Sequence, residues 1–482
     1  MKLERLFYPK SVAVIGASPH VGGGKVRFFQ VLQENGYKGA LYPVNPKYKE
    51  IGGVKAYASP DDLPDAVDLT IVAAPVQQSL DIMRTAARKK FRFVHFFTSG
   101  FGEVGNGQLE EELLREARKG GVRIVGPNCM GAHCTESGVS FGRTAGGKSP
   151  GSIAFLGQSG GVTGNFMSMA RTRKIDLNKV VSYGNQIDMR VEDFLDCFAD
   201  DRNIRLIACY IEDIKDTRAF LKVLRRTTAQ KPVIILKGGR TESGAKAAAS
   251  HTGAMASDYT LWSSAVRQHG AILVDDFDGM MNMVMLGAEE KRPTGRRMGF
   301  VGAGGGVSVL FTDLASQEGL SLPELQPDTQ QRILETIRGI NTSTTNPVDL
   351  GAFGFDLNIM LHAMKAMDED ENIDVIVPYF SVEYIKKAEV MLNVKNDEQT
   401  FLRMSRAIRK PVIPILASFT EDDLELERTR ISVFANLRKA GFPVYTRIHD
   451  AVCAVRRYLE WAEKQDMTTA DCEPPIRMRA TG

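Results

Sequence analysis

The chain has 482 residues, of which 43% are hydrophobic and 25% charged, with a formal net charge of +3 at pH 7. This composition is that of an ordinary globular protein, and the balanced charge gives no reason to expect nucleic acid or an anionic membrane as partner. No apolar run approaches the ~20 residues that cross a bilayer, and the opening apolar segment is too short for a signal peptide. We therefore expect a cytoplasmic protein with no nucleic-acid or membrane partner.

Three segments along the chain share one pattern, in which a short apolar strand meets a glycine and small residues then lead toward a helix. They read "VAVIGAS" at 12–18, "IAFLGQSGG" at 153–161 and "MGFVGAGGG" at 298–306. The spacing between them is close to one domain length. The pattern therefore predicts three α/β modules in series.

The strands predicted inside each module are apolar throughout rather than alternating. Examples are "DLTIVAAP" and "FRFVHFFTSG" in the first module, "LIACYIED" and "KPVIILKGG" in the second, and "DVIVPYF" and "KPVIPILAS" in the third. Such runs, separated by helical stretches such as "LEEELLREARKG", are typical of parallel strands covered on both faces. The sequence predicts doubly wound parallel sheets, with domains at 1–145, 146–291 and 292–465 and a polar tail at 466–482.

Each glycine turn is a candidate anion site, because in open parallel sheets ligands bind beyond the carboxyl ends of the strands, where helix N-termini favour phosphate. A literal phosphate-loop match, "GRTAGGKS" at 142–149, is set aside because Pro150, Gly151 and a new strand follow where a helix would have to begin. The six cysteines form no CxxC pair, and no HExxH motif or Cys/His cluster occurs in the sequence, so we expect free thiols and no metal site.

One histidine, His251, stands among residues too small to pack around it, in "KAAASHTGAMASD" at 246–258. We expect a loop here, in which Gly244, Gly253 and the intervening alanines let the imidazole move. With an ordinary pKa near 6.5, such an imidazole is largely neutral and nucleophilic at cytoplasmic pH.

Nine segments, in order, resemble the α subunit of the NDP-forming acyl-CoA synthetases, the ADP-forming acetyl-CoA synthetase group related to succinyl-CoA synthetase. The resemblance runs from about residue 5 to about residue 460. Its anchors are "SVAVIGAS" at 11–18, "YPVNPK" at 42–47, "TSGFGE" at 98–103, "VGPNC" at 125–129, "QSGGV" at 158–162, "YGNQIDM" at 183–189, "YIED" at 210–213, "SHTGAM" at 250–255 and "NPVDL" at 346–350.

The resemblance implies a Rossmann-like coenzyme A binding domain followed by two flavodoxin-like, succinyl-CoA synthetase-like domains. It implies an acid-thiol ligase that interconverts acyl-CoA, phosphate and ADP with a small carboxylic acid, coenzyme A and ATP through an acyl phosphate and a phosphohistidine. His251 matches the phosphorylated histidine and Glu212 the glutamate that steadies it. The matched phosphate-binding residues are Ser159, Gly160 and Gly161, and the matched coenzyme A residues are Gly16, Ala17, Ser18, Val44, Pro46, Lys47, Pro75, Ser99, Gly100 and Asn128.

Two departures from the family pattern bear on function. The segment "GVSFGRT" at 138–144 replaces a run that usually reads Asn-Ala-Thr-Phe, so the wall of the acid site is expected to differ. No ATP-grasp domain is present, so the resemblance implies that ATP or ADP and Mg bind to a separate ATP-grasp β subunit, in an α2β2 assembly.

Two other functions compete with this one. The chain could be a non-catalytic, coenzyme A binding regulatory subunit that kept the fold without the chemistry. It could also be a nicotinamide-dependent dehydrogenase, but "GASPHVGGG" at 16–24 is an incomplete dinucleotide fingerprint. The joint presence of His251, Glu212 and the Ser159–Gly161 turn favours the ligase.

Overall fold

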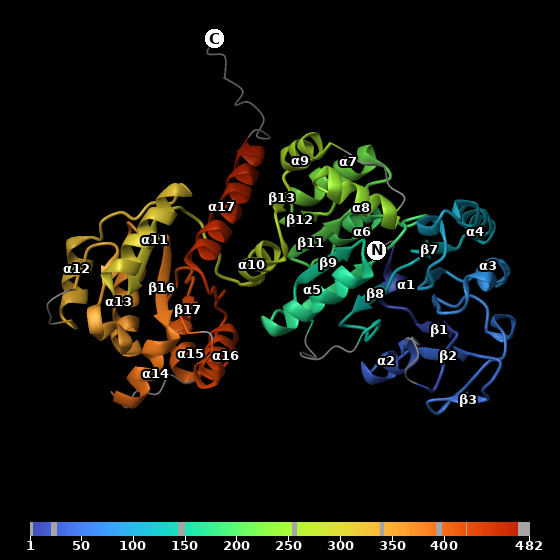
Figure 1. Cartoon of the computed structure of the whole chain (residues 1–482), viewed down its shortest axis with the longest axis horizontal. Coiled ribbons are helices and arrows are strands. Elements are labelled where there is room, and N and C mark those ends of the chain that lie inside the picture. The colour runs from blue at the N-terminus through green and yellow to red at the C-terminus, as the bar shows by residue number, and fades with distance from the viewer. Residues whose placement is uncertain are drawn as a thin grey trace, which may run out of the picture. The chain divides into compact units, whose positions relative to one another are not determined.

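The computed structural model describes residues 3–20, 27–142, 150–252, 258–337, 342–391, 398–420 and 422–470 (Figure 1). The chain divides into two compact units, Met1–Met280 and Met281–Gly482. Within the described residues, no helix combines the length and the apolar character needed to span a bilayer.

The first sheet is parallel throughout and has the strand order β2-β1-β5-β6-β7. Its two central strands are completely buried, which explains their continuous apolar sequence. The strands are β1 (Ser11–Ile15), β2 (Ala40–Val44), β5 (Leu69–Val72), β6 (Phe93–Phe96) and β7 (Arg123–Val125), and the helices α1 (Glu4–Phe7), α2 (Phe28–Glu34), α3 (Ser79–Arg88) and α4 (Gly107–Gly120) accompany them.

The second sheet belongs to the same unit and has the order β13-β12-β11-β9-β10-β8. Five strands are parallel, whereas β8 pairs antiparallel with β10 at one edge. The strands are β8 (Gly131–Cys134), β9 (Ile153–Gly157), β10 (Leu177–Ser182), β11 (Leu206–Ile211), β12 (Val233–Lys237) and β13 (Ile272–Val274). The helices are α5 (Gly160–Thr172), α6 (Val191–Ala199), α7 (Thr217–Thr228), α8 (Glu242–Thr252), α9 (Tyr259–Gln268) and α10 (Phe277–Ala288).

The third sheet lies in the second unit, is parallel and has the order β15-β14-β16-β17. Its strands are β14 (Met298–Gly302), β15 (Val348–Asp349), β16 (Val375–Ser381) and β17 (Ile415–Ala417). The helices are α11 (Gly305–Gln317), α12 (Pro327–Leu334), α13 (Leu357–Glu369), α14 (Val382–Met391), α15 (Glu398–Ala407), α16 (Leu424–Lys439) and α17 (Ile448–Ala470).

The predicted α/β class and parallel sheets are therefore confirmed. All three predicted openings begin with a strand, and the second and third pass directly into α5 and α11. After β1 the next described helix is α2, and residues 21–26 between them lie outside the described residues. The division into three domains remains a prediction. Of the polar tail, residues up to 470 continue α17, and 471–482 lie outside the described residues.

The expected loop around His251 is wrong for most of its length, since residues 242–252 form α8. Alanine has the highest intrinsic helix propensity, and the Ala-rich run favours a helix even without bulky packing residues. Thr241 supports the first turn, because its hydroxyl accepts a hydrogen bond from the N–H of Gly244 at 3.1 Å. A Lys246–Glu242 pair, 2.8 Å between Nζ and Oε1, adds one i,i+4 ion pair.

Two histidines are buried in the first unit. His95 lies on β6 with Nε2 2.9 Å from the carbonyl oxygen of Cys129, and His133 lies on β8 between the hydroxyls of Ser140 and Thr135. Burial lowers the pKa of each imidazole to about 4, so both rings are neutral at neutral pH.

Because these two rings are buried and neutral, we predict that the first unit loses stability in acid. Because the folded-state pKa is depressed below the ordinary value of 6.5, their contribution to stability is fully present above pH 6.5 and is lost as the pH falls toward 4. For each ring, the lowered pKa corresponds to a loss of about 3 kcal/mol of folding free energy at a pH well below the folded-state pKa. The measurement is urea unfolding between pH 6.5 and 4 in a Trp461→Phe background, in which Trp262 reports on the first unit. On unfolding, His95→Gln should take up about one proton fewer than the parent. An unchanged pH slope would contradict the buried neutral ring.

Candidate active site

The first glycine turn is built by backbone constraints at the carboxyl end of β1. Gly16 has a φ of +86°, and a Cβ there would lie 2.4 Å from the carbonyl oxygen of Ala73, so only glycine fits. The side chain of Asn45 donates to the carbonyl of Ala17 at 2.7 Å and accepts from the N–H of Lys47 at 3.0 Å. The Gly16–Ser18 turn and the Val44–Lys47 turn are thus tied together, with Val44 buried and Pro46 and Lys47 exposed.

The next three predicted residues follow along the same edge of the sheet. Pro75 comes after β5 and Ser99 after β6, whose strands are paired in register. The Thr98 hydroxyl donates to the carbonyl of Ala74 at 2.6 Å, and the N–H of Asn128 donates to the carbonyl of Thr98 at 3.1 Å. Adjacent carboxyl ends therefore hold Pro75, Ser99 and Asn128 side by side.

The phosphate-binding turn predicted at 159–161 forms the start of α5. Ser159 is the N-cap, and its hydroxyl accepts a hydrogen bond from the N–H of Val162 at 3.4 Å. The amides of a first helical turn have no acceptor within the helix, and the helix dipole adds positive potential there. A Cβ on Gly161 would meet open space. This turn can therefore receive an anion from outside.

A cleft of about 570 Å³ lies between turns of the first sheet and the phosphate turn of the second. On one side it is lined by Pro75, Ser99 and Asn128, and on the other by Gly160 and Gly161. The remaining lining residues are Ala73, Ala74, Phe97, Thr98, Cys129 and Met130. Five residues predicted separately from sequence thus share one cavity, although 86 positions separate Pro75 from Gly161 in the sequence.

Glu212 lies next to this turn through Gln158, a residue that we did not single out from sequence. The side-chain oxygen of Gln158 accepts hydrogen bonds from the N–H groups of Glu212 at 2.8 Å and Asp213 at 2.9 Å. Burial, the charge of Glu212 and a hydrogen bond to that carboxylate raise the pKa of the Tyr210 phenol well above its ordinary value. Gln158 therefore joins the phosphate turn to the end of β11.

His251 is the second-last residue of α8, and its side chain lies outside the described residues. The helix itself packs against the short 3₁₀ turn η3 (Gly102–Val104), which follows Ser99 and Gly100. The helix that carries His251 therefore contacts the turn that follows the cleft-lining residue Ser99. Among the described side chains of α8, residues 242–247, only Ala245 is buried.

A second group missed by sequence reasoning is Glu103 with Asn185. The amide nitrogen of Asn185 donates to Glu103 at 2.6 Å and to Glu110 at 2.8 Å, and its oxygen accepts from the side chain of Asn128 at 3.4 Å. Burial opposes ionisation of Glu103, but hydrogen bonds from the Gly100 N–H and from Asn185 lower its pKa below the usual range. An ionised carboxylate thus sets the Gly100 turn and the orientation of Asn128.

Lys237 is a third residue that sequence reasoning passed over, a lysine ending the apolar strand β12. Its ammonium donates to the carbonyl of Glu212 at 2.8 Å and to that of Gly238, and lies 5.7 Å from the ring centre of Trp262. Burial lowers its pKa, and the nearby carboxylates of Asp213 and Glu212 oppose this effect. The sequence feature that could have identified it is a lysine at the end of a continuous apolar run, because lysine is seldom buried without a partner.

The third glycine turn differs from the second, because the protein fills it with its own anion. Asp349 Oδ1 accepts hydrogen bonds from the N–H of Gly304 at 2.8 Å and of Gly351 at 2.9 Å. We expected each of the three turns to be a possible anion site. Here a carboxylate of the chain lies at the start of α11 and accepts from the Gly304 amide, which disfavours a second anion at this turn.

Two family models match this chain between residues 10 and 286. Residues 10–135 match the CoA binding domain, and residues 150–286 match the succinyl-CoA ligase like flavodoxin domain. A relative from Pyrococcus furiosus, ADP-forming acetate–CoA ligase I subunit alpha, is 32% identical over 474 residues, which cover 96% of this chain and 98% of the relative. The chain belongs to the α-subunit family of the NDP-forming acyl-CoA synthetases. The resemblance predicted from sequence is thereby confirmed, as is the class of acid-thiol ligase.

Two further comparisons show how much of the chain resembles its relatives. An ADP-forming acetate–CoA ligase I from Archaeoglobus fulgidus is 34% identical over 80% of this chain, but the match spans only 56% of that protein. The structure of a dinucleotide forming acetyl-coenzyme A synthetase 1 from Ca. Korarchaeum cryptofilum, in complex with phosphate and ADP, is 28% identical, with a TM-score of 0.82 over 98% of this chain and all of that one. The family fold thus extends over both units of this chain.

Two glycine-to-alanine substitutions test the coenzyme A side and the phosphate side of the site separately. Gly16→Ala meets the carbonyl of Ala73 at a positive φ, costs about 1–3 kcal/mol of strain, and should weaken coenzyme A binding, measured by calorimetry, about tenfold or more. Gly161→Ala meets no protein atom, so coenzyme A should bind as in the parent, while phosphate binding is weakened by the methyl group in the cleft. Equal effects of both changes on coenzyme A would contradict this assignment.

Proposed function

We propose that this chain is the acyl-transferring subunit of an ADP-forming acyl-CoA synthetase. In one direction, phosphate attacks the thioester carbon of an acyl-CoA, the C–S bond breaks, and coenzyme A and an acyl phosphate are formed. The imidazole of His251 then attacks the phosphorus, the acyl carboxylate leaves, and the phosphoryl group remains on the ring until it passes to ADP. Each step is reversible, so the same residues serve synthesis of the acyl-CoA.

The observation that carries this proposal is the shared cleft. Ser99 and Asn128 stand on the side of the coenzyme A turns, and Gly160 and Gly161 stand on the side of the phosphate turn. A thioester held at the first set lies next to an anion held at the second. Two reactants held together in this way react as in a unimolecular step, which removes much of the entropic barrier.

The phosphate turn supplies a fixed electrostatic site. The amides of the first turn of α5 and the dipole behind them need no rearrangement as charge builds up on the transferring group. Ser159 keeps its own hydroxyl on the N–H of Val162, so the turn keeps its shape with or without a ligand. Lys237 donates to the carbonyls of Glu212 and Gly238, and so ties together the ends of β11 and β12 on one side of this site.

His251 and Glu212 have distinct roles in the proposal. The Glu212 carboxylate accepts a hydrogen bond from the non-reacting ring nitrogen and so fixes the tautomer. The ring must then reach a nucleotide elsewhere. Among the side chains described on α8, those of residues 242–247, only Ala245 is buried, so little packing opposes displacement of this first part of the helix. Movement of a lightly packed helix thus replaces the loop motion that we expected from sequence.

Coenzyme A is assigned to the first sheet. The Gly16–Ser18 turn and Val44, Pro46 and Lys47 form one tied surface, on which the exposed Lys47 is free to meet a phosphate of the nucleotide portion. Pro75, Ser99, Gly100 and Asn128 continue this surface toward the cleft. The substrate is a small carboxylic acid, held near Asn128.

The nucleotide is assigned to a partner. We propose a separate ATP-grasp β subunit that binds ADP or ATP with Mg, in an α2β2 assembly located in the cytoplasm. The relative from Pyrococcus furiosus is named a subunit alpha, and the Archaeoglobus protein extends well beyond the matched part of this chain. Both observations support a nucleotide site on sequence that this chain does not carry.

The proposal predicts a phosphorylated histidine. Incubation with labelled phosphate and a panel of acyl-CoA thioesters should give an acid-labile, alkali-stable label on the parent chain and none on His251→Asn. Glu212→Gln should slow labelling by roughly 100-fold or more, since the ring loses its hydrogen-bonded orientation. The matched control is His269→Asn, whose ring bonds the carbonyl of Ala265 within its own helix and which should label normally.

Absence of label with every thioester, while coenzyme A still binds, would contradict the proposal. That outcome would favour the regulatory, coenzyme A binding subunit instead. Label that persists in His251→Asn would place the phosphoryl carrier elsewhere in the chain.

A further inference from the structure

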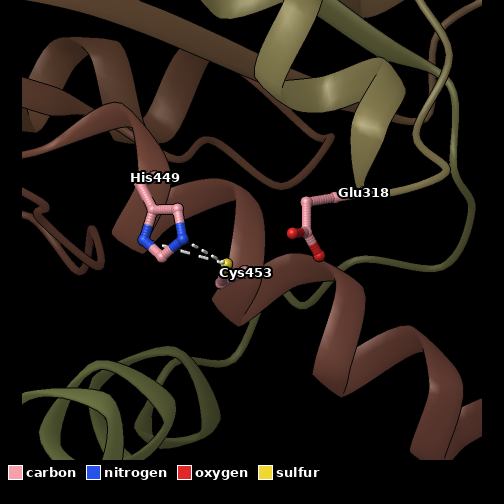
Figure 2. A group of neighbouring side chains, drawn as sticks. All are labelled: Glu318, His449 and Cys453. Atoms are coloured by element: carbon pink, nitrogen blue, oxygen red, sulfur yellow. Dashed lines mark hydrogen bonds between the residues drawn. The ribbon is translucent and has the colours of Figure 1, made fainter.

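The second unit contains a group of three potential metal ligands away from the cleft (Figure 2). Glu318 is the residue that ends α11, and His449 and Cys453 stand four positions apart near the start of α17. The two helices pack against each other. One ligand atom from each residue lies within 4.8 Å of the other two. The group is thus assembled from two helices more than 130 positions apart in sequence.

We propose that Glu318, His449 and Cys453 form a binding site for a divalent ion of the zinc class. An imidazole nitrogen, a thiolate and a carboxylate oxygen are the ligand types that Zn²⁺ takes in proteins. The site supplies three protein ligands, which leaves the fourth tetrahedral position for water.

The spacing of the two helical ligands suits a tetrahedral ion. His449 Nε2 lies 3.4 Å from Cys453 Sγ. Ligands at about 2.0–2.1 Å (nitrogen) and 2.3 Å (sulfur) from a tetrahedral Zn²⁺ stand roughly 3.5 Å apart. Sγ also lies 3.9 Å from Nδ1, so the exposed His449 ring must turn until the Nε2 lone pair faces the sulfur before an ion can bind both atoms. The carboxylate of Glu318 points toward the same space from the facing helix (Figure 2).

A carboxylate lies near the histidine ligand. Asp450 Oδ1 is 3.8 Å from Nδ1 of His449, which is too far for a hydrogen bond in this rotamer. In metal sites a carboxylate on the second ring nitrogen favours the tautomer whose free nitrogen binds the ion, and Asp450 is placed for that role once the ring turns so that Nε2 faces the ion. Arg447 in turn pairs with Asp450 at 2.8 Å.

Two features set the conditions for binding. Cys453 must bind as the thiolate, so binding of the ion releases the thiol proton to solvent. Glu318 also pairs with Arg456, which has a second partner in Glu460 at 2.7 Å. Arg456 therefore competes with the ion for Glu318 and can release it without losing all of its own pairing.

The amino-acid sequence contains no local metal-ligand motif, and we expected no metal site for that reason. His449 and Cys453 give only an i,i+4 pair, and the third ligand is supplied by the fold. A bound ion would link the end of α11 to the start of α17 and stabilise their contact, since it binds only the folded arrangement.

The test is a titration of the untagged full chain with Co²⁺, in a Cys472→Ser background. The four other cysteines that the structure describes are buried, so a thiolate-to-cobalt charge-transfer band reports on Cys453. We expect one Co²⁺ per chain, displaced by Zn²⁺. Cys453→Ser should abolish the band, and His449→Gln and Glu318→Gln should each weaken binding about tenfold or more.

Arg456→Gln is the variant that separates a metal site from a mere packing contact. It removes the competitor for Glu318 and should tighten Co²⁺ binding, whereas loss of a structural ion pair alone would leave binding unchanged or weaker. The proposal is overturned if the parent gives no thiolate band, if the band survives Cys453→Ser, or if His449→Gln and Glu318→Gln bind Co²⁺ as tightly as the parent.

Discussion

The backbone hydrogen bonds between residues 124–127 and 185–189 fix the site, because they fasten the first sheet to the second. The N–H groups of Asn185, Ile187 and Met189 donate to the carbonyls of Pro127, Gly126 and Ile124 at 3.0–3.2 Å. The chain then continues into β8, which completes the edge of the second sheet beside β10. The link between the two sheets is therefore itself a wall of the cleft, and Asn128 and Met130 stand in it.

This joint explains why turns of two separate sheets line one cleft. A parallel sheet exposes its loops at the carboxyl ends of its strands, and the joint brings two such edges to one space. Gly184 supports the close approach, since it has a φ of +53° and a Cβ there would lie 2.2 Å from the carbonyl of Pro127. Glu103 and Asn185 then extend the joint with side chains, from the Gly100 turn to Asn128. The proposed chemistry thus depends on residues to which the proposal assigns no substrate contact.

Much of the fold could be predicted from sequence because continuous apolar runs mark strands buried on both faces, and strands such as β5, β12 and β16 lie where these runs predicted them. The helix α8 was mistaken for a loop because we judged small residues by their lack of packing instead of by their helix propensity. Gln158 and Asn185 stand inside the motifs "QSGGV" and "YGNQIDM", and Lys237 ends an apolar run, but their roles depend on contacts between distant segments that these local patterns do not describe. The same holds for the group of Glu318, His449 and Cys453.

The central claim is that the thioester end of coenzyme A and the phosphate occupy one cleft between the two sheets. A crystal structure of the chain with both coenzyme A and phosphate bound tests it most directly. We expect the phosphate within hydrogen-bonding distance of the Gly160 and Gly161 amides, and the thiol sulfur in the same cavity beside Ser99 and Asn128. Phosphate at another helix start, or a thiol directed away from the cleft, would contradict the account.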